Sequence, residues 1–177
     1  VFVYIRGEYT GPYEVLRSAL EELKERRELR GDVTIVVHRG AGAYICGEET
    51  ARLESLEGKR GQPRTKPPFP AVQGLDASPT VVNNVETLSH VPGIITQGAD
   101  WFRSFGTDDT PGTMVFTVLG DVRHPAVRER PVAGTLRQLI EDVAGGAQDG
   151  RRIKAVLPGL ANAGGTEGKL DTVLGFD

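Results

Sequence analysis

One glycine-rich stretch, GAGAYICGEET, contains the residues whose types best suit ligand binding. Residues 40–50 hold three glycines, a tyrosine and two adjacent glutamates, and they follow an apolar run at 33–37. A turn at the carboxyl end of a strand is where open α/β sheets bind their ligands. Glycine there lets the backbone approach a ligand closely, and the free N–H groups of a following helix suit a polar or anionic ligand. The stretch therefore predicts a ligand-binding turn.

Two carboxylates, Glu48 and Glu49, stand side by side at the start of the predicted helix. Adjacent side chains on a helix point about 100° apart, which argues against the facing carboxylates of a glycosidase. Acidic residues in a first helical turn are also favoured by the helix macrodipole.

A proline-rich segment at 59–80 has two possible interpretations. Its prolines exclude a helix and largely exclude a central strand, and long connections of this kind tend to be functional when ordered. It can be a solvated connector, or it can form one wall of a nucleotide site, with Phe69 as a stacking face and cations that meet phosphate or ribose. The cations are Lys59, Arg60, Arg64 and Lys66.

Two adjacent asparagines follow this segment. Asn83 or Asn84 can cap a helix on which Val85, Leu88 and Val91 recur. Capping explains one asparagine, so at least one amide is left for a ligand or a buried polar network.

The usual catalytic residue sets are absent from the sequence. The three histidines, His38, His90 and His124, lie far apart and lack zinc-binding spacing, so structural or surface roles are expected for them. There is no nucleophile elbow and no P-loop, and we predict no catalytic residue and no metal ligand. Cys46 is the single cysteine, so this chain cannot supply the four thiolates that usually hold an iron–sulfur cluster. Binding residues without acid–base machinery suggest that a cofactor supplies the reactivity.

The first half of the chain reads as a βαβ unit of a parallel sheet. Apolar runs predict buried strands, and apolar residues at helical spacing predict helices with a charged outer face. The expected elements are strands at 1–5 and 33–37, and helices at 14–30 and 48–57 that end at Gly31 and Gly58.

The second half reads as a small α+β module. We expect a short aromatic helix within 98–106, a linker at 107–112, strands at 114–119, 125–132 and 153–157, and a helix capped by Thr135 that ends at 145–146. Prolines make the strand at 125–132 irregular, and the glycine-rich residues 159–168 predict a mobile loop or a backbone-lined pocket. The order of elements suggests a β-grasp fold.

Composition excludes several classes of protein. The chain has 177 residues, 38% hydrophobic and 25% charged, which suits one globular domain or two small ones. The net charge of −3 gives no basic field for nucleic acid. No apolar run approaches the roughly 20 residues that span a bilayer. A single cysteine fits a cytoplasmic setting, and the start within an apolar run suggests a piece of a longer protein.

Three runs resemble a known family: YIRGEY at 4–9, HRGAGAYICGEETARLESLEGKRGQPRTKPPFPA at 38–71 and PTVVNNVET at 79–87. They look like the flavoprotein subunit of respiratory complex I, an NADH:quinone oxidoreductase, and the related diaphorase subunits of NAD-dependent hydrogenases and formate dehydrogenases. The resemblance implies an α/β fold, with part of a parallel-sheet FMN/NADH-binding domain at 1–92, a connecting segment at 93–112 and a β-grasp domain at 113–177.

The resemblance also implies FMN and NADH as cofactors, with hydride transfer from the nicotinamide to the flavin. Tyr44, Gly47, Glu48 and Glu49 would line the two rings, and Gly40 and Gly42 belong to the same turn. Lys66 would help hold the dinucleotide, with Phe69 near the adenine. Asn83, Asn84 and Thr87 would bind the ribityl chain and phosphate of FMN.

Partners follow from the same resemblance. We expect other subunits of an NADH dehydrogenase complex, including an iron–sulfur subunit, at the cytoplasmic side of the membrane and without direct membrane insertion. A [4Fe–4S] cluster is expected in the parent protein but not in this piece, because the family's downstream cysteine quartet is not in this chain. The alternatives are a diaphorase subunit or, for this piece alone, a non-catalytic docking module.

Overall fold

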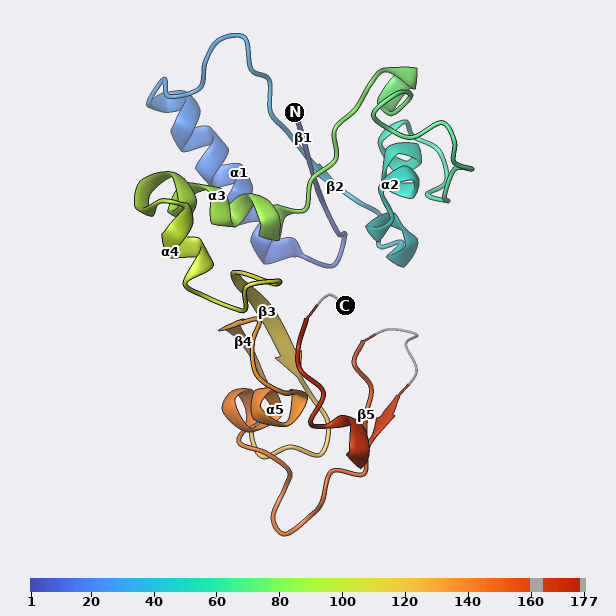
Figure 1. The fold of residues 1–177 in the computed structure, drawn as a ribbon. Helices are drawn as coiled ribbons and strands as arrows, with labels where there is room; N and C mark the ends of the chain where they lie inside the picture. Colours follow the sequence, from blue (N-terminus) through green and yellow to red (C-terminus); the bar gives the residue numbers. More distant parts are fainter. Residues whose placement is uncertain (160–163, 176–177) are drawn as a thin grey trace. The chain divides into compact units, whose positions relative to one another are not determined.

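Two units make up the fold. The computed structural model describes residues 1–159 and 164–175. The first unit runs from Val1 to Asn83 and the second from Asn84 to Asp177. Both units combine helices with small sheets (Figure 1), which confirms the α/β class in its broad sense.

The first unit is built on a parallel strand pair. Strands β1 (Phe2–Ile5) and β2 (Val36–Arg39) pair with Phe2 opposite Val36, and helix α1 (Thr10–Glu25) connects them. This confirms the βαβ unit. The expected burial of β1 on both faces is wrong, because Phe2 is 50% exposed while Ile5 is buried. Two strands and one helix cannot cover both faces of a sheet.

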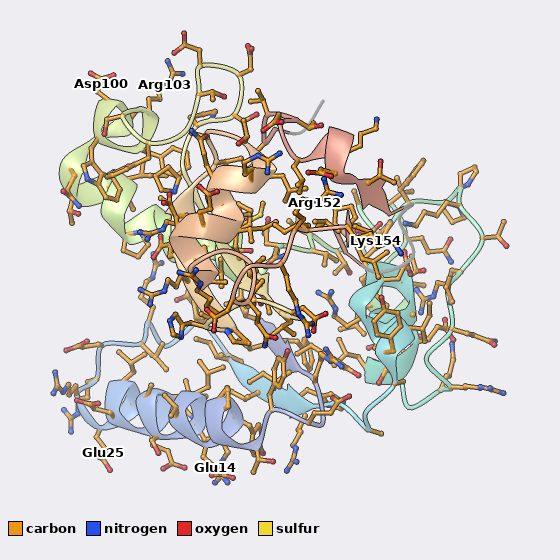
Figure 2. The ribbon with its side chains drawn as sticks, turned by 90° about the horizontal axis from the view of Figure 1, so that it is seen from below. Glu14, Glu25, Asp100, Arg103, Arg152 and Lys154 are labelled. Carbon is orange, nitrogen blue, oxygen red and sulfur yellow. The ribbon has the colours of Figure 1, made fainter. Side chains whose placement is uncertain are left out.

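Helix α1 starts and ends earlier than predicted. It includes Pro12, which costs no helical hydrogen bond in a first turn, where the N–H groups have no partner. It ends with Arg27 at φ +56°, while the N–H groups of Arg27 and Glu28 bond back to Lys24 and Leu23. This Schellman ending uses an arginine in the left-handed region, so the expected stop at Gly31 is wrong. Its charged face is as predicted: Figure 2 shows Glu14 and Glu25 pointing away from the strands.

The glycine turn leads into two short helices. After β2 come the 3₁₀ helix η1 (Tyr44–Gly47) and helix α2 (Glu49–Leu56). Leu53 of α2 is buried, and the helix ends, as predicted, at Gly58 with φ +75°. The proline-rich segment contains only one short 3₁₀ helix in the structure, η2 (Leu75–Ala77).

Two helices open the second unit. Helix α3 (Val85–Gln97) is capped by Asn84, whose Oδ1 accepts a hydrogen bond from the N–H of Glu86 at 2.8 Å. Helix α4 (Ala99–Arg103) carries Trp101, which packs edge-on against Phe105 at 5.5 Å. The predicted cap and the predicted aromatic helix are therefore confirmed.

A strand pair and a helix form the centre of this unit. Strands β3 (Thr113–Val118) and β4 (Ala126–Pro131) are antiparallel. The expected irregularity of β4 is wrong, because Pro125 and Pro131 lie at its ends. Helix α5 (Leu136–Ala144) has the predicted cap at Thr135, here a full capping box with Gln138, and it ends at Gly145 in the left-handed region. The core of the second unit is a buried cluster of Val122, Ile140, Ala144 and Leu170.

The last strands form a separate sheet. Strand β5 (Ala155–Val156) pairs antiparallel with β6 (Gly165–Thr166), followed by the 3₁₀ helix η3 (Glu167–Lys169). Within 1–159 and 164–175, no pairing joins these strands to β3 and β4, and the β-grasp fold is not confirmed. The predicted loop or pocket at 159–168 lies partly outside the described residues, which omit 160–163.

Candidate functional site

Two turns approach each other at the carboxyl ends of β1 and β2. One spans residues 6–9 and the other residues 40–43. An ideal Cβ on Gly7 would lie 2.4 Å from the carbonyl oxygen of Gly40 and 2.8 Å from the nitrogen of Gly42. Only a residue without a side chain permits this approach. The second turn was predicted as a site from the sequence, whereas no role was predicted for Gly7, although Gly7 lies within the family-like run YIRGEY.

Arg39 fastens these two turns together. Its Nε and Nη2 donate hydrogen bonds to the carbonyl oxygen of Gly7 at 2.9 and 2.6 Å, and Nη2 also donates to Oγ1 of Thr10 at 2.8 Å. The guanidinium fork thus satisfies one acceptor in the turn at 6–9 and one on the first residue of α1. This residue was not predicted from the sequence, because an arginine after an apolar run carries no signal of its long-range partner.

The first two glycines of the turn have structural roles. An ideal Cβ on Gly40 would lie 2.3 Å from the Oη of Tyr4, which hydrogen-bonds to Ser55 Oγ at 3.0 Å. Burial raises the pKa of this tyrosine. Gly42 adopts φ +85°, a backbone conformation that glycine accepts without a steric cost. Both glycines therefore shape the turn, whether or not a ligand also contacts them.

Gly47 and Tyr44 present an open surface. Apart from its two chain neighbours and the backbone of its own short helix, no heavy atom of the described residues lies within 4 Å of an ideal Cβ on Gly47. Tyr44, at the other end of η1, is 64% exposed, whereas Cys46 between them is buried. Bare backbone next to an exposed aromatic ring is a surface that a flat ligand can contact.

Glu48 closes the start of α2. Its Oε2 accepts hydrogen bonds from the N–H groups of Thr50 and Ala51 at 2.8 and 2.9 Å and from the Thr50 hydroxyl at 2.5 Å. The expectation of free N–H groups for an anionic ligand is therefore wrong at these two positions, because the chain's own carboxylate occupies them. Burial opposes ionisation, but the hydrogen bonds from Thr50, Ala51 and Lys66 outweigh it and lower the pKa of Glu48 to about 2.

Lys66 joins both carboxylates. Its Nζ lies 3.0 Å from Oε1 of Glu48 and 2.7 Å from Oε1 of Glu49. The predicted divergence of the two side chains assumed that both are helical, whereas Glu48 has an extended backbone with ψ 135°. The hydrogen bonds to Glu49 and then Glu48 raise the pKa of Lys66. The three side chains, 30–38% exposed, remain reachable for a ligand.

Other cations of the proline-rich segment have internal partners. Arg64 pairs with Glu54 at 2.5 Å and Glu57 at 2.6 Å and donates to the carbonyl oxygen of Gly74 at 2.8 Å. Lys59 pairs with Glu57 at 2.8 Å. These residues line a cavity of about 560 Å³. Arg64 therefore holds the segment against α2, and contact between the cations and phosphate stays a prediction.

The remaining predicted site residues are exposed. Phe69 is 57% exposed, and its carbonyl oxygen accepts hydrogen bonds from Val72 and Gln73. Asn83 and Thr87 are also exposed, and the carboxamide oxygen of Asn84 is used by the helix cap. Asn83 ends the first unit, whereas Asn84 and Thr87 belong to the second. That all these residues share one ligand stays a prediction.

The described residues give no sign of metal binding or of a transmembrane helix. Residues 1–159 and 164–175 contain no cluster of three or more histidine, cysteine, aspartate or glutamate side chains that could hold a metal ion. Nor does any helix within these ranges have the length and apolar character needed to cross a membrane. The chemistry that the site supports is binding through backbone, aromatic and charged groups.

Comparisons with known proteins agree on one family. Residues 1–93 match the model of the family described as Nuo51 FMN-binding domain. The chain is 50% identical to an NADH-quinone oxidoreductase subunit of Rhizobium meliloti (strain 1021), over 99% of this chain and 44% of the relative. It is 43% identical to NADP-reducing hydrogenase subunit HndC of Solidesulfovibrio fructosivorans, over 99% of this chain and 37% of the relative.

A solved structure is similar over nearly the whole chain. The crystal structure of an NAD⁺-reducing [NiFe]-hydrogenase in the air-oxidized state matches with a TM-score of 0.86 and 38% identity, over 99% of this chain and 30% of that one. The chain thus spans less than half the length of the relatives it matches.

Proposed function

Because this chain belongs to the Nuo51 FMN-binding domain family, we propose that it is part of a flavoprotein subunit that oxidises NADH with FMN as acceptor. One observation carries the proposal: the open backbone of Gly47 next to the exposed ring of Tyr44, at the carboxyl end of a parallel strand pair. This is the edge of a sheet at which α/β proteins bind nucleotides.

The residues present fit a flat cofactor ring. A ring that stacks on peptide backbone needs a position without a side chain, and Gly47 provides one with free space in front of it. Tyr44 adds an aromatic face within the same short helix. FMN, when bound, supplies the electron-accepting ring, so the site needs no acid–base residue of its own.

The charged residues suit the nucleotide. Glu49 and Lys66 are paired, with carboxylate and ammonium 2.7 Å apart, and both remain about one-third exposed. They can hold ribose hydroxyls and the dinucleotide through charge-assisted hydrogen bonds. Glu48 holds Lys66 and the start of α2, and so orients this pair. Phe69 would lie near the adenine.

We assign the ribityl chain and phosphate of FMN to Asn83, Asn84 and Thr87. All three are exposed and carry amide or hydroxyl groups. Because the Asn84 oxygen caps α3, its NH₂ group would face the ligand. This part of the proposal rests on the family pattern.

We extend the proposal to the whole protein. Residues 1–92 would complete an FMN/NADH-binding domain together with chain outside these residues, 93–112 would connect, and 113–177 would contribute to a β-grasp domain. Electrons would pass to iron–sulfur clusters, including a [4Fe–4S] cluster elsewhere in the parent protein, and to an iron–sulfur partner subunit of a complex at the inner face of the membrane. Both of these relatives are named as subunits, which supports partner subunits for this protein.

A second candidate is the diaphorase subunit of a hydrogenase or formate dehydrogenase. It is favoured by the hydrogenase subunit and hydrogenase structure that match 99% of the chain. The genes that neighbour the full-length gene distinguish the two: hydrogenase genes support the diaphorase, and quinone oxidoreductase genes support the first candidate.

Substituting Gly47 tests the site without disturbing the fold. Gly47→Ala places a methyl group in open space, at a residue without positive φ, so the melting temperature should stay unchanged. A ring that stacks on this backbone should be displaced, and we expect the dissociation constant of FMN, measured by flavin fluorescence quenching in the full-length protein, to rise about tenfold, or about 1.4 kcal/mol.

Gly31→Ala is the matched control. Gly31 also has open space at its ideal Cβ and no positive φ, but it lies outside the turn. This variant should bind FMN like the unmodified protein. Equal FMN affinity in both variants would remove Gly47 from the ring site. Absence of FMN binding in the unmodified full-length protein would contradict the proposed function, whereas absence of FMN binding in this piece alone would favour the docking-module alternative for it.

A further inference from the structure

Arg52 contacts the turn that carries Gly47. From the first turns of α2, its Nε donates to the carbonyl oxygen of Cys46 at 3.3 Å, and its Nη2 donates to that of Gly47 at 3.0 Å. These carbonyls belong to the two peptide groups on either side of Gly47. Because each peptide group is planar, fixing both carbonyls fixes φ and ψ of the residue between them. The side chain thereby restrains the residue type with the greatest backbone freedom.

The helix that carries Arg52 is a firm support. Its neighbours Ala51 and Leu53 are buried, and the backbone N–H of Arg52 donates to the carbonyl oxygen of Glu48 at 3.1 Å. The start of this helix is held by the Glu48 carboxylate. Arg52 therefore links the Gly47 turn to the packed part of the unit and holds the turn in place.

Arg52 also contributes a positive charge that is not neutralised locally. Lys59, Arg64 and Lys66 each pair with two carboxylates within 4 Å. Within residues 1–159 and 164–175, by contrast, Arg52 makes no ion pair with any carboxylate, and its two hydrogen bonds go to neutral carbonyls. Its charge therefore faces the turn at Gly47 without a carboxylate partner within 4 Å.

We propose that Arg52 is a positioning residue that locks the Gly47 turn for the cofactor ring and favours the reduced ring through its charge. The inference rests on the proposed function, in which this turn faces FMN. The flavin ring carries more negative charge after it has accepted electrons than before. A nearby cation therefore stabilises the reduced ring and raises its reduction potential. A locked turn binds the ring more tightly, because less backbone entropy is lost on binding.

The test compares Arg52→Met with Arg52→Lys in the full-length protein. Methionine keeps the length of the side chain but loses charge and donors, whereas lysine keeps the charge without the guanidinium fork. Three quantities are measured: the FMN dissociation constant, the midpoint potential of bound FMN in a redox titration, and amide hydrogen exchange of residues 44–48 without FMN. Arg26→Met, on the exposed end of α1, is the control.

We expect Arg52→Met to lower the midpoint potential, to weaken FMN binding about tenfold and to speed exchange at 44–48. Arg52→Lys should weaken binding and speed exchange but keep a potential close to that of the unmodified protein. The control should change none of the three. Unchanged potential and unchanged exchange in Arg52→Met would overturn the inference. Faster exchange in that variant, combined with no FMN binding by the unmodified protein, would overturn the proposed function and the role toward the ring, while leaving the lock on the turn.

Discussion

Glu48 links the backbone of α2 to the site. Its carboxylate accepts hydrogen bonds from two backbone N–H groups and a hydroxyl. It also pairs with Lys66, which in turn pairs with Glu49. A carboxylate with so many donors is strongly favoured in its charged form. The capping and the orientation of the charged pair therefore depend on the ionisation of one residue.

The low pKa of Glu48 predicts a specific loss of stability in acid. Its pKa is 4.5 when unperturbed and about 2 in the folded chain. Its contribution is therefore present above pH 4.5 and is lost as the pH falls toward 2. Glu48→Gln should lower the free energy of unfolding at pH 7 by about 1–2 kcal/mol, measured by urea unfolding.

The same variant should show a weaker decrease in stability between pH 4.5 and pH 2 than the unmodified chain. Glu25→Gln, on the outer face of α1 (Figure 2), should change neither stability nor its pH dependence. An unchanged pH profile in Glu48→Gln would contradict the assigned role.

Glu49 provides a test of nucleotide binding. In the proposed site its carboxylate faces the nucleotide, and Lys66 remains held by Glu48 when this charge is removed. Glu49→Gln in the full-length protein should raise the KM for NADH or alter product release, while FMN stays bound. Steady-state kinetics and the flavin absorbance of the purified protein measure the two effects. Loss of FMN with normal NADH kinetics would show that the residue is misassigned.

At the scale of elements, Arg64 determines the path of the proline-rich segment. The side chains of Glu54 and Glu57 are only 16% and 8% exposed, and Arg64 pairs with both. Hydrogen bonds from Lys59 and Arg64 lower the pKa of Glu57 to about 2. The segment has few backbone hydrogen bonds of its own, so this ion-pair cluster replaces regular secondary structure.

Substituting Arg64 alone should destabilise the fold more than substituting Arg64 and Glu57 together. Arg64→Met leaves Glu54 and Glu57 in a largely buried site with only the exposed Lys59 as a cationic partner, and we expect a loss of about 2–4 kcal/mol in the free energy of unfolding. The double variant Arg64→Met/Glu57→Gln should recover part of this loss. Chemical denaturation of the two variants measures the difference. Equal stabilities would indicate that the cluster does not hold the segment.

Local signals in the sequence predicted several elements correctly. Thr135 and Gly145 bound α5 because a capping residue and a left-handed glycine act on their immediate neighbours. The turn before α2 was located in the same way. Interactions over long sequence distances were not predictable: Arg39 reaches Gly7, and Arg64 reaches Gly74, through side chains whose direction no spacing encodes. The stop of α1 at Arg27 was missed because a non-glycine residue adopts positive φ there.

At the scale of the whole molecule, the chain exposes an unusually large surface. Its accessible area is 12,609 Å² for 19.1 kDa. A compact monomer of this mass is expected to expose roughly 8,400 Å², and two separate units of half the mass roughly 10,100 Å² together. The excess includes large apolar side chains such as Phe2 and Val15, which are 50% and 69% exposed. Where such side chains form a contiguous patch, it is usually covered by another protein segment or a partner.

We therefore expect the 177-residue chain to bind the hydrophobic dye ANS, and the full-length protein to bind less of it per chain. The reason is that the longer protein can cover the apolar side chains that this chain exposes. Dye fluorescence at matched chain concentration measures the difference, with a compact monomer of similar mass as the reference. No excess fluorescence from the shorter chain would mean that its exposed apolar residues are too scattered to bind the dye.

The cap on α2 has a consequence for how a nucleotide is divided among the segments of the protein. Since Glu48 already occupies the electropositive end of this helix, an incoming phosphate would be repelled there, and in the proposed site the tail of the ligand would be received by another stretch. Ring and tail would then be recognised by separate pieces of chain. Substitutions in one piece could then change the reduction potential of the ring, and substitutions in the other could change the affinity for the ligand, each without affecting the other property.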